Sequence, residues 1–349
     1  MKSIMDHILN RIGGWFDNYF IKLLHLALKY YNFRFPHGNH YVNLVVRPKT
    51  NRINYRNKIK TQLNDVCIII QGPLDNIDFV LQSIQLYRRY YPDTTVIVSS
   101  WLKYKKAHKV RILSAGGTPV FSREPILAGQ LNINMQIVST RVALKLAQRM
   151  RCTYVVKSRS DQRFYNPNAI EYLSWLSREF ITGSKAPRER ILIPGFNTTR
   201  YRYGSFGDMF QFGHINDLVS YWGLALDCRT GDLRGDAKKN GKYSLEYSAQ
   251  IEITEAYLGR NYMKLLGVDA FPDLNAYWKC LAENFVVFDH TAIDLYWNKY
   301  QSIDNFISET PAFRKDRMYE KIDFTEWLLM QSNKITFHDS EKERQKKIR

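Results

Sequence analysis

The sequence predicts an α/β protein with an open, mostly parallel sheet and helices on both of its faces. From residue 65 onward, short apolar segments alternate with segments of helical spacing, as they do in a run of βα units. The first apolar segment is continuous, as expected for a parallel strand that is buried on both sides. Of the 349 residues, 45% are hydrophobic and 14% aromatic, a composition typical of a globular chain.

The elements of this alternation can be followed along the chain. The first strand, VCIIIQGPL at 66–74, is apolar and ends at Gly72-Pro73, and the helix that follows it stops at Pro92. Further on, the sequence predicts strands at 94–101, 118–122, 153–163 and 284–289, a short helix or turn at 105–117, and helices at 131–150 and 244–260.

Polar residues follow several of these strands. In open parallel sheets, ligands bind beyond the C-terminal ends of the strands. We therefore expect one cleft to collect the polar residues at these ends, which are 71–73, 99–101, 122–123 and 157–163.

The chain is strongly basic, with a formal net charge of +18, which favours an anionic partner. Residues 1–60 contain eleven lysines and arginines and two acids, so half of the net positive charge lies in this part of the chain. Apolar residues from 4 to 26 recur at three- and four-residue steps beside these charges. This pattern fits a helix on an anionic membrane surface, or a helix that caps the core or a dimer partner. We expect three parts: this extension and a linker at 1–60, a catalytic domain at 61–335, and a charged tail at 336–349.

Several common site signatures are absent from the sequence. There is no GxGxxG dinucleotide fingerprint, no GxxxxGK[ST] loop, no GxSxG elbow and no HExxH pair. The four cysteines are scattered singly, so we expect neither a zinc ribbon nor a disulfide framework, and reduced thiols in the cytosol are the simplest account.

The segment YVVKSRSDQR, residues 154–163, combines one acid with three cations at the end of the fourth strand. Asp161 could hold Mg²⁺ or Mn²⁺ together with phosphate oxygens, since such an ion often takes only one or two carboxylates. Lys157, Arg159 and Arg163 could bind phosphate or ribose oxygens. The structural alternative is an ion pair between Asp161 and one of the two arginines.

At these residues the chain resembles the WavE lipopolysaccharide-synthesis family, whose members look like GT-A glycosyltransferases. The matching segments span about 65–260: VCIIIQGPL, VIVSSW, NINMQIVSTRVALKLA, YVVKSRSDQR, DMFQFG and SLEYSAQ. The resemblance implies a GT-A-like fold, a nucleotide-sugar donor and a divalent metal near the end of the fourth strand. GT-A enzymes carry an Asp-x-Asp motif there, whereas this chain has Arg159-Ser160-Asp161, so only Asp161 matches.

The same resemblance implies roles for other residues. Gln71, Gly72 and Pro73 would flank the nucleotide base, although Gly72-Pro73 is also an ordinary strand-to-helix turn. Ser100 and Trp101 end the second strand, and Trp101 could stack on the base or pack beneath the sheet. Among Asn132, Asn134 and Gln136, one asparagine can be explained as a helix N-cap, and the others would face the donor.

A carboxylate base is expected to deprotonate the acceptor hydroxyl in a single-displacement reaction. Glu246, near the start of the helix at 244–260, is the first candidate for this base. Asp208, in the aromatic and glycine-rich loop GSFGDMFQFG, is the second. The structural alternatives are a favourable charge at a helix N-terminus for Glu246 and an ordinary turn acid for Asp208.

The function expected from these observations is glycosyl transfer to a lipid-linked or oligosaccharide acceptor in bacterial lipopolysaccharide or surface-polysaccharide synthesis. The enzyme would be peripheral on the cytoplasmic face of the inner membrane, and no nucleic-acid partner is expected. A nucleotidyltransferase is the rival enzyme, but QGPLDNID lacks the glycine-rich loop with Arg or Lys that this class would carry. The rival from another class is a non-catalytic basic protein that binds membranes or nucleic acid. In that case the basic and aromatic segment TTRYRYGSF could bind nucleic acid.

Overall fold

The computed structural model describes residues 19–20, 22–31, 34, 65–181, 189–229, 252–309 and 320–332. The chain divides into two units, Met1–Lys49 and Thr50–Arg349. In the first unit, residues 22–31 are helical and expose most of their apolar side chains, including Leu23 and Leu26. The predicted helix is thus confirmed for this part, and its membrane role stays a prediction. Among the helices of the described residues, none has the length and hydropathy needed to span a bilayer.

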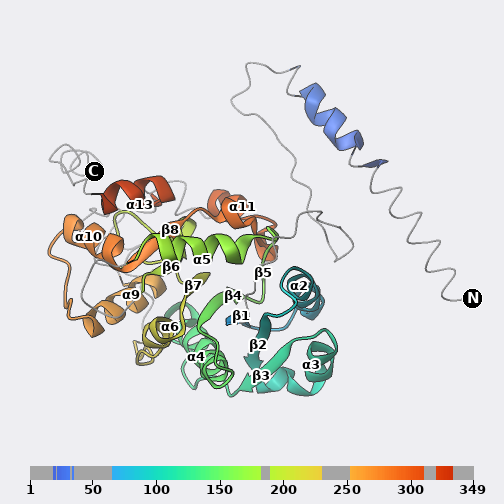
Figure 1. The fold of residues 1–349 in the computed structure, drawn as a ribbon, viewed down its shortest axis with the longest axis horizontal. Helices are drawn as coiled ribbons and strands as arrows, with labels where there is room; N and C mark the ends of the chain where they lie inside the picture. Colours follow the sequence, from blue (N-terminus) through green and yellow to red (C-terminus); the bar gives the residue numbers. More distant parts are fainter. Residues whose placement is uncertain are drawn as a thin grey trace, which may run out of the picture. The chain divides into compact units, whose positions relative to one another are not determined.

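The second unit contains a seven-stranded sheet in the order β3-β2-β1-β4-β7-β6-β8. The strands β1 (Val66–Gln71), β2 (Thr95–Trp101), β3 (Thr118–Ser122) and β4 (Tyr154–Arg159) pair in parallel (Figure 1). β7 (Gln211–His214) is antiparallel to β4 and to β6 (Ile191–Pro194), which is parallel to β8 (Phe285–Phe288). The predicted fold class, an open and mostly parallel α/β sheet, is therefore confirmed.

The central strands are apolar because both faces of the sheet are covered. α2 (Ile77–Tyr90) and α3 (Leu102–Ser114) cross the sheet in one direction, and α4 (Ile133–Arg149) crosses back, so right-handed connections place α4 on the opposite face. α4 packs against β1, β2 and β3. All six residues of β1 are buried. In the registers Gln71↔Ser99 and Gln71↔Arg159, the strand ends align, which brings their polar residues together.

The rest of the unit packs around the other half of the sheet. Its helices are α5 (Ala169–Glu179), α6 (Ile215–Trp222), α9 (Thr254–Leu265), α10 (Leu274–Asn284), α11 (Ile303–Glu309) and α13 (Phe324–Gln331). A separate ribbon pairs β5 (Gln162–Phe164) with β9 (Leu295–Trp297), and Gln162 lies opposite Trp297. The predicted fourth strand therefore stops at Arg159, and the chain turns at 160–161 before β5 begins. This pairing carries residues near 297–299 to the end of β4.

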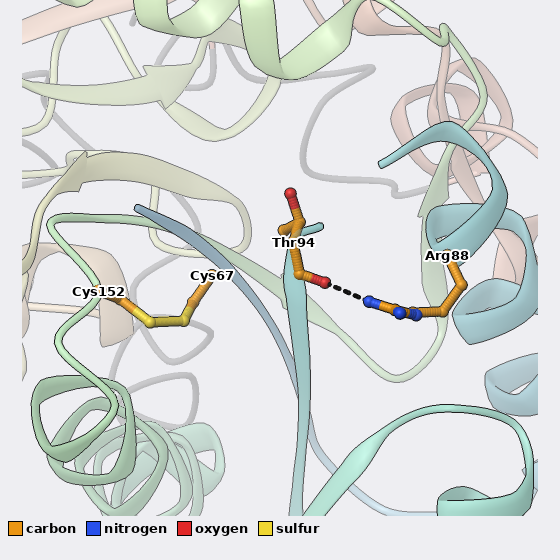
Figure 2. Close-up of a disulfide and its surroundings, with 4 residues drawn as sticks. All are labelled: Cys67, Arg88, Thr94 and Cys152. Carbon is orange, nitrogen blue, oxygen red and sulfur yellow. Dashed lines mark hydrogen bonds between the residues drawn. A yellow bond between two sulfur atoms is a disulfide. The ribbon is translucent and has the colours of Figure 1, made fainter. Parts of the chain in front are cut away.

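The expectation that all cysteines are reduced thiols was wrong for two of them. Cys67 on β1 and Cys152 just before β4 form a disulfide, with their Cα atoms 6.0 Å apart (Figure 2). The same view shows Arg88 donating a hydrogen bond to the Thr94 carbonyl at 3.0 Å, which joins the end of α2 to the start of β2. Isolated positions in the sequence could not reveal the pair, because the parallel pairing of β1 with β4 is what brings Cys67 close to Cys152.

Candidate functional site

A cleft of about 690 Å³ lies beyond the C-terminal ends of β1, β2 and β4. Five segments line it: the turn after β1, the start of α3, the start of α4, the turn after β4 and the residues that follow β9. The lining residues are Gln71, Gly72, Pro73, Asp75, Asn76, Trp101, Lys103, Tyr104, Leu131, Asn132, Met135, Gln136, Arg159, Ser160, Asp161, Asn298 and Lys299. The cleft thus lies where the sheet topology predicts a ligand site.

The turn after β1 requires glycine at position 72. Gly72 has a φ of +135°, and a Cβ atom there would lie 2.6 Å from Ser160 Oγ. Its N–H donates to the Ser99 carbonyl, and its carbonyl accepts a hydrogen bond from Ser100 Oγ at 2.8 Å. Gln71 is held on the α4 side by Ser139 Oγ, which donates to its Oε1 at 2.8 Å. These contacts hold the backbone of this part of the cleft wall in one conformation.

The turn after β4 forms an ion pair at the cleft wall. Arg159 donates to Asp161 Oδ1 from Nε at 2.9 Å and to Oδ2 from Nη2 at 3.2 Å, and Trp297 Nε1 donates to Oδ2 at 2.8 Å. Burial acts to raise the pKa of Asp161, but Arg159 and Trp297 outweigh it and hold that pKa below its usual range. For Arg159, desolvation acts to lower the pKa, and the Asp161 carboxylate more than reverses this. Both groups therefore stay charged.

The residues around Asp161 suit a guanidinium better than a divalent metal. Both carboxylate oxygens already accept hydrogen bonds from Arg159 or Trp297. Within the described part of the chain, no group of three or more His, Cys, Asp or Glu side chains could hold an ion. A metal at Asp161 would also have to displace or face the Arg159 charge. The predicted metal thus stays a prediction, and no chemical step below depends on one.

The lining presents groups that complement a phosphorylated ligand. Arg159 and Lys299 bring positive charge to one side of the cleft, and Lys103, which pairs with Glu124 at 2.7 Å, lies at another. Gln136 has a buried Oε1 that no donor reaches among the described residues. Trp101 offers an aromatic side chain at the end of β2. Together with Tyr104, the cleft thus offers cations, amides and two aromatic side chains, which are groups that can contact a nucleoside diphosphate.

A second group of charges is buried beside the cleft. Lys157 is fully buried, donates to the Asp208 carbonyl oxygen at 2.5 Å and lies 4.5 Å from the Trp222 ring centre. Desolvation lowers the pKa of Lys157 to about 7, although the Asp208 charge opposes the shift. Burial raises the pKa of Asp208 in spite of Lys157 and Arg159. Among the described residues no donor reaches Asp208 Oδ2, while Asn197 donates to Oδ1 at 3.2 Å.

Glu255, in the first turn of α9, belongs to the same group. Burial raises its pKa to about 7, and the neighbouring Asp208 charge acts in the same direction. Arg159 and Arg202 counter this in part. Arg159 lines the cleft and also interacts electrostatically with both acids, so it connects the two groups of charges. A carboxylate that titrates near neutrality is suited to general-base chemistry.

Several predicted site residues are placed elsewhere. Ser100 is buried and supports the Gly72 carbonyl. Asn134 is buried within the first turn of α4, where Asn132 holds the N-cap position without a side-chain hydrogen bond. Its Nδ2 donates to the Leu127 and Asp227 carbonyls, and its Oδ1 accepts from the Asp227 N–H. Arg163 lies in the core, 4.0 Å from the Phe79 ring centre, and donates to Ser83 Oγ and the Phe79 carbonyl. None of Ser100, Asn134, Arg163 and Lys157 lines the cleft. Glu246 lies outside the described residues.

The sequence predictions missed Trp297, Asn298, Lys299 and Glu255. Asn298 and Lys299 reach the cleft, and Trp297 reaches Asp161, only through the pairing of β5 with β9, across more than a hundred residues of chain. Glu255 lies in the helical segment that was predicted, nine positions beyond the acid that was chosen. A hint was available, because Glu255 directly precedes the buried stretch of α9, whose buried residues include Ala256 and Leu258.

One family profile matches most of the chain, and solved structures give only low structural similarity. The profile of the WavE lipopolysaccharide synthesis family matches residues 66–346. No curated protein matches the chain. Among solved structures, a glycosyltransferase involved in glycosylation of the major capsid of PBCV-1 has a TM-score of 0.30 at 9% identity, over 64% of this chain and 81% of that one.

Two further solved structures give similar values. A cytidylyltransferase from Leptospira borgpetersenii has a TM-score of 0.29 at 12% identity, over 71% of this chain and 96% of that one. The 4-diphosphocytidyl-2C-methyl-D-erythritol synthase of Anaerococcus prevotii has a TM-score of 0.32 at 10% identity, over 51% and 84%. TM-scores this low do not choose between transferase classes, so the choice depends on the cleft itself.

Proposed function

Because this chain belongs to the WavE lipopolysaccharide synthesis family, we propose that it is a GT-A-like glycosyltransferase. It would move a sugar from a nucleoside-diphosphate donor to a lipid-linked or oligosaccharide acceptor. The observation that carries the proposal is the cleft at the ends of β1, β2 and β4, where Arg159 and Lys299 lie on one side and Trp101 ends a neighbouring strand. The proposed site of action is the cytoplasmic face of the bacterial inner membrane, with the exposed helix at 22–31 as a basic membrane anchor.

In this proposal, the cations of the cleft hold the diphosphate. Arg159 is positioned by Asp161 and Trp297, so its side chain is oriented before a ligand arrives. Lys299 supplies a second charge from the segment after β9. As the bond from the anomeric carbon to the diphosphate breaks, negative charge grows on the leaving oxygen. Fixed cations stabilise that charge more than they stabilise the ground state, which lowers the barrier.

The incoming hydroxyl must lose its proton as its oxygen attacks the anomeric carbon. Three carboxylates are candidates for receiving it: Glu246 and Asp208, as the sequence suggested, and Glu255. Among the described acids, Glu255 has a pKa of about 7, which suits proton transfer at neutral pH. It interacts electrostatically with Arg159 of the cleft but does not line the cleft itself. In this role, the nearby Asp208 charge helps to raise the pKa of Glu255 by repulsion.

The first test is a thermal-shift screen of the full chain with UDP, GDP, CDP, CMP and ADP. Each nucleotide is measured with Mn²⁺, with Mg²⁺ and with EDTA, so that the predicted metal is tested in the same series. A ligand that binds only the native state raises the midpoint. Arg159→Gln should weaken diphosphate binding about tenfold or more, since one charge-assisted hydrogen bond is worth about 1.5–3 kcal/mol. Lys279→Gln, whose side chain is 74% exposed on α10, is the matched control.

The outcome also distinguishes the rival functions. A glycosyltransferase releases a nucleoside diphosphate from its donor, whereas a nucleotidyltransferase releases pyrophosphate from a nucleoside triphosphate. Detection of pyrophosphate with sugar phosphate and nucleoside triphosphate would replace our proposal by the second activity. If no nucleotide shifts the wild-type midpoint and no product forms, the Arg159–Asp161 pair is a structural ion pair, and the non-catalytic binding protein becomes the better description.

A further inference from the structure

We propose that the catalytic unit itself carries a membrane-docking surface at the mouth of the cleft, and that its partner is an anionic phospholipid bilayer. The surface, called the α3 face below, consists of the outward side of α3 and the exposed apolar residues of the segment that follows β3. Its members are Leu102, Lys105, Lys106, Lys109, Val110, Leu113, Ile126, Leu127 and Leu131.

The first half of the α3 face is an unusual helix. Its sequence, LKYKKAHKVRILS, contains five lysines and arginines and no acid. The only buried residue is Ile112, while Val110 and Leu113 are 71% and 51% exposed. At 100° per residue, Leu102, Lys106 and Leu113 point within about 40° of one another, and they lie roughly 100° around the helix from the buried Ile112. The outward side therefore interleaves aliphatic side chains with lysines.

The second half lies in the segment between β3 and α4. Ile126 is fully exposed, and Leu127 and Leu131 are 53% and 47% exposed. Lys103 at the start of α3 pairs with Glu124 at 2.7 Å, so this segment begins beside α3. In Figure 1, α3 lies next to β3, the edge strand of the sheet. Three large aliphatic side chains are therefore exposed within six residues of the chain.

The α3 face adjoins the cleft. Lys103 and Tyr104 from α3 and Leu131 and Asn132 from the second segment all line it. A bilayer in contact with the α3 face would therefore lie at the mouth of the cleft. This consequence rests on the proposed function, because a lipid-linked acceptor would then reach the cleft with its lipid still in the membrane.

The chemistry of the face favours lipid over other partners. Aliphatic side chains can enter the acyl region while neighbouring lysines remain at anionic headgroups. A second copy docking by two-fold symmetry would place two acid-free lysine clusters against each other, which is repulsive. Single-stranded nucleic acid is bound mainly by stacking on aromatic side chains, and the exposed apolar members of this face are aliphatic.

The experiment measures how the full chain partitions onto phosphatidylcholine vesicles with and without phosphatidylglycerol. One variant removes apolar contacts, Val110→Gln with Leu113→Gln, and a second reverses charge, Lys105→Glu with Lys109→Glu. The matched controls are Leu265→Gln, at a 59% exposed leucine of α9, and Arg178→Glu with Lys279→Glu on α5 and α10. Val110→Trp adds a reporter whose fluorescence should shift to the blue when the ring enters lipid.

We expect wild type to bind anionic vesicles and not neutral ones. Each α3-face variant should lose about tenfold or more in partitioning, with both controls within about twofold of wild type. Thermal midpoints and nucleotide shifts should stay at wild-type values, which separates this inference from the proposed function. Unchanged partitioning of the α3-face variants, or no blue shift of Val110→Trp, would overturn it. Loss of a wild-type dimer in the Val110→Gln/Leu113→Gln variant would assign the face to a second copy instead.

Discussion

Replacing Glu255 by glutamine should stabilise the protein above neutral pH, although it removes a group that we propose to be functional. The pKa of Glu255 is raised from 4.5 to about 7 by burial and by Asp208. Because the folded state raises this pKa, the protonated Glu255 carboxyl stabilises the fold. This contribution is fully present below about pH 4.5 and is lost as the pH rises through about 7. A shift of this size corresponds to about 3 kcal/mol.

Two effects reduce that magnitude. Part of the Glu255 side chain reaches solvent, so some of the desolvation cost is not realised. Its position in the first turn of α9 also gives the charge a favourable helix-dipole interaction of about 0.5 kcal/mol, which glutamine loses. The expected gain of Glu255→Gln is therefore about 1–2 kcal/mol near pH 8 and close to zero near pH 4.5.

Urea unfolding of wild type and Glu255→Gln at several pH values between about 4.5 and 8 measures this difference. The urea midpoint of Glu255→Gln should rise above that of wild type as the pH increases. The dependence of the unfolding free energy on urea concentration should be the same for both proteins, since the surface exposed on unfolding is the same. Glu283→Gln, at a 59% exposed residue paired with Lys279, is the matched control and should lower stability slightly without this pH dependence. If the Glu255→Gln variant has the same unfolding free energy as wild type, or is less stable by a constant amount at every pH, the reasoning is refuted.

Three further predictions concern the turn after β1, the disulfide and the buried Arg163. Gly72→Ala should cost about 1–3 kcal/mol of folding free energy in chemical denaturation, and adding Ser160→Gly should recover only the part due to the Cβ contact, because the φ of +135° remains. Removing the disulfide with Cys152→Ala should lower stability by about 2–5 kcal/mol and make the thermal midpoint insensitive to reductant, whereas Cys228→Ser, at a free exposed cysteine, should change neither. Arg163→Met should destabilise the fold by about 2 kcal/mol or more and leave nucleotide affinity at the wild-type value; a selective loss of affinity would return Arg163 to the ligand site.

The sequence alone was sufficient for the parallel strands β1 to β4 and for one wall of the site, but not for β6 and β7. Continuous apolar runs and Gly-Pro stops are local signals, so β1, β2, β3 and β4 could be located from them. Parallel strands end at the same edge of a sheet, and this general rule placed Gln71, Gly72, Pro73, Trp101 and Arg159 in one cleft.

Only the tertiary structure decided which cations of YVVKSRSDQR reach the ligand site. The turn at 160–161 interrupts the alternation of side chains along the strand, so Arg159 lines the cleft while Arg163 turns into the core against Phe79. Lys157 lies on β4 beneath Trp222, a residue of α6 that no local pattern connects to it.

The other side of the site depends on pairings between distant segments. Trp297 and Lys299 reach Asp161 and the cleft because β9 pairs with β5. The pKa of Glu255 is raised because folding buries it beside Asp208, from another part of the chain. Hydrophobic periodicity reports which face of an element is buried, but charge interactions depend on distances in space, and these are set only when the elements pack.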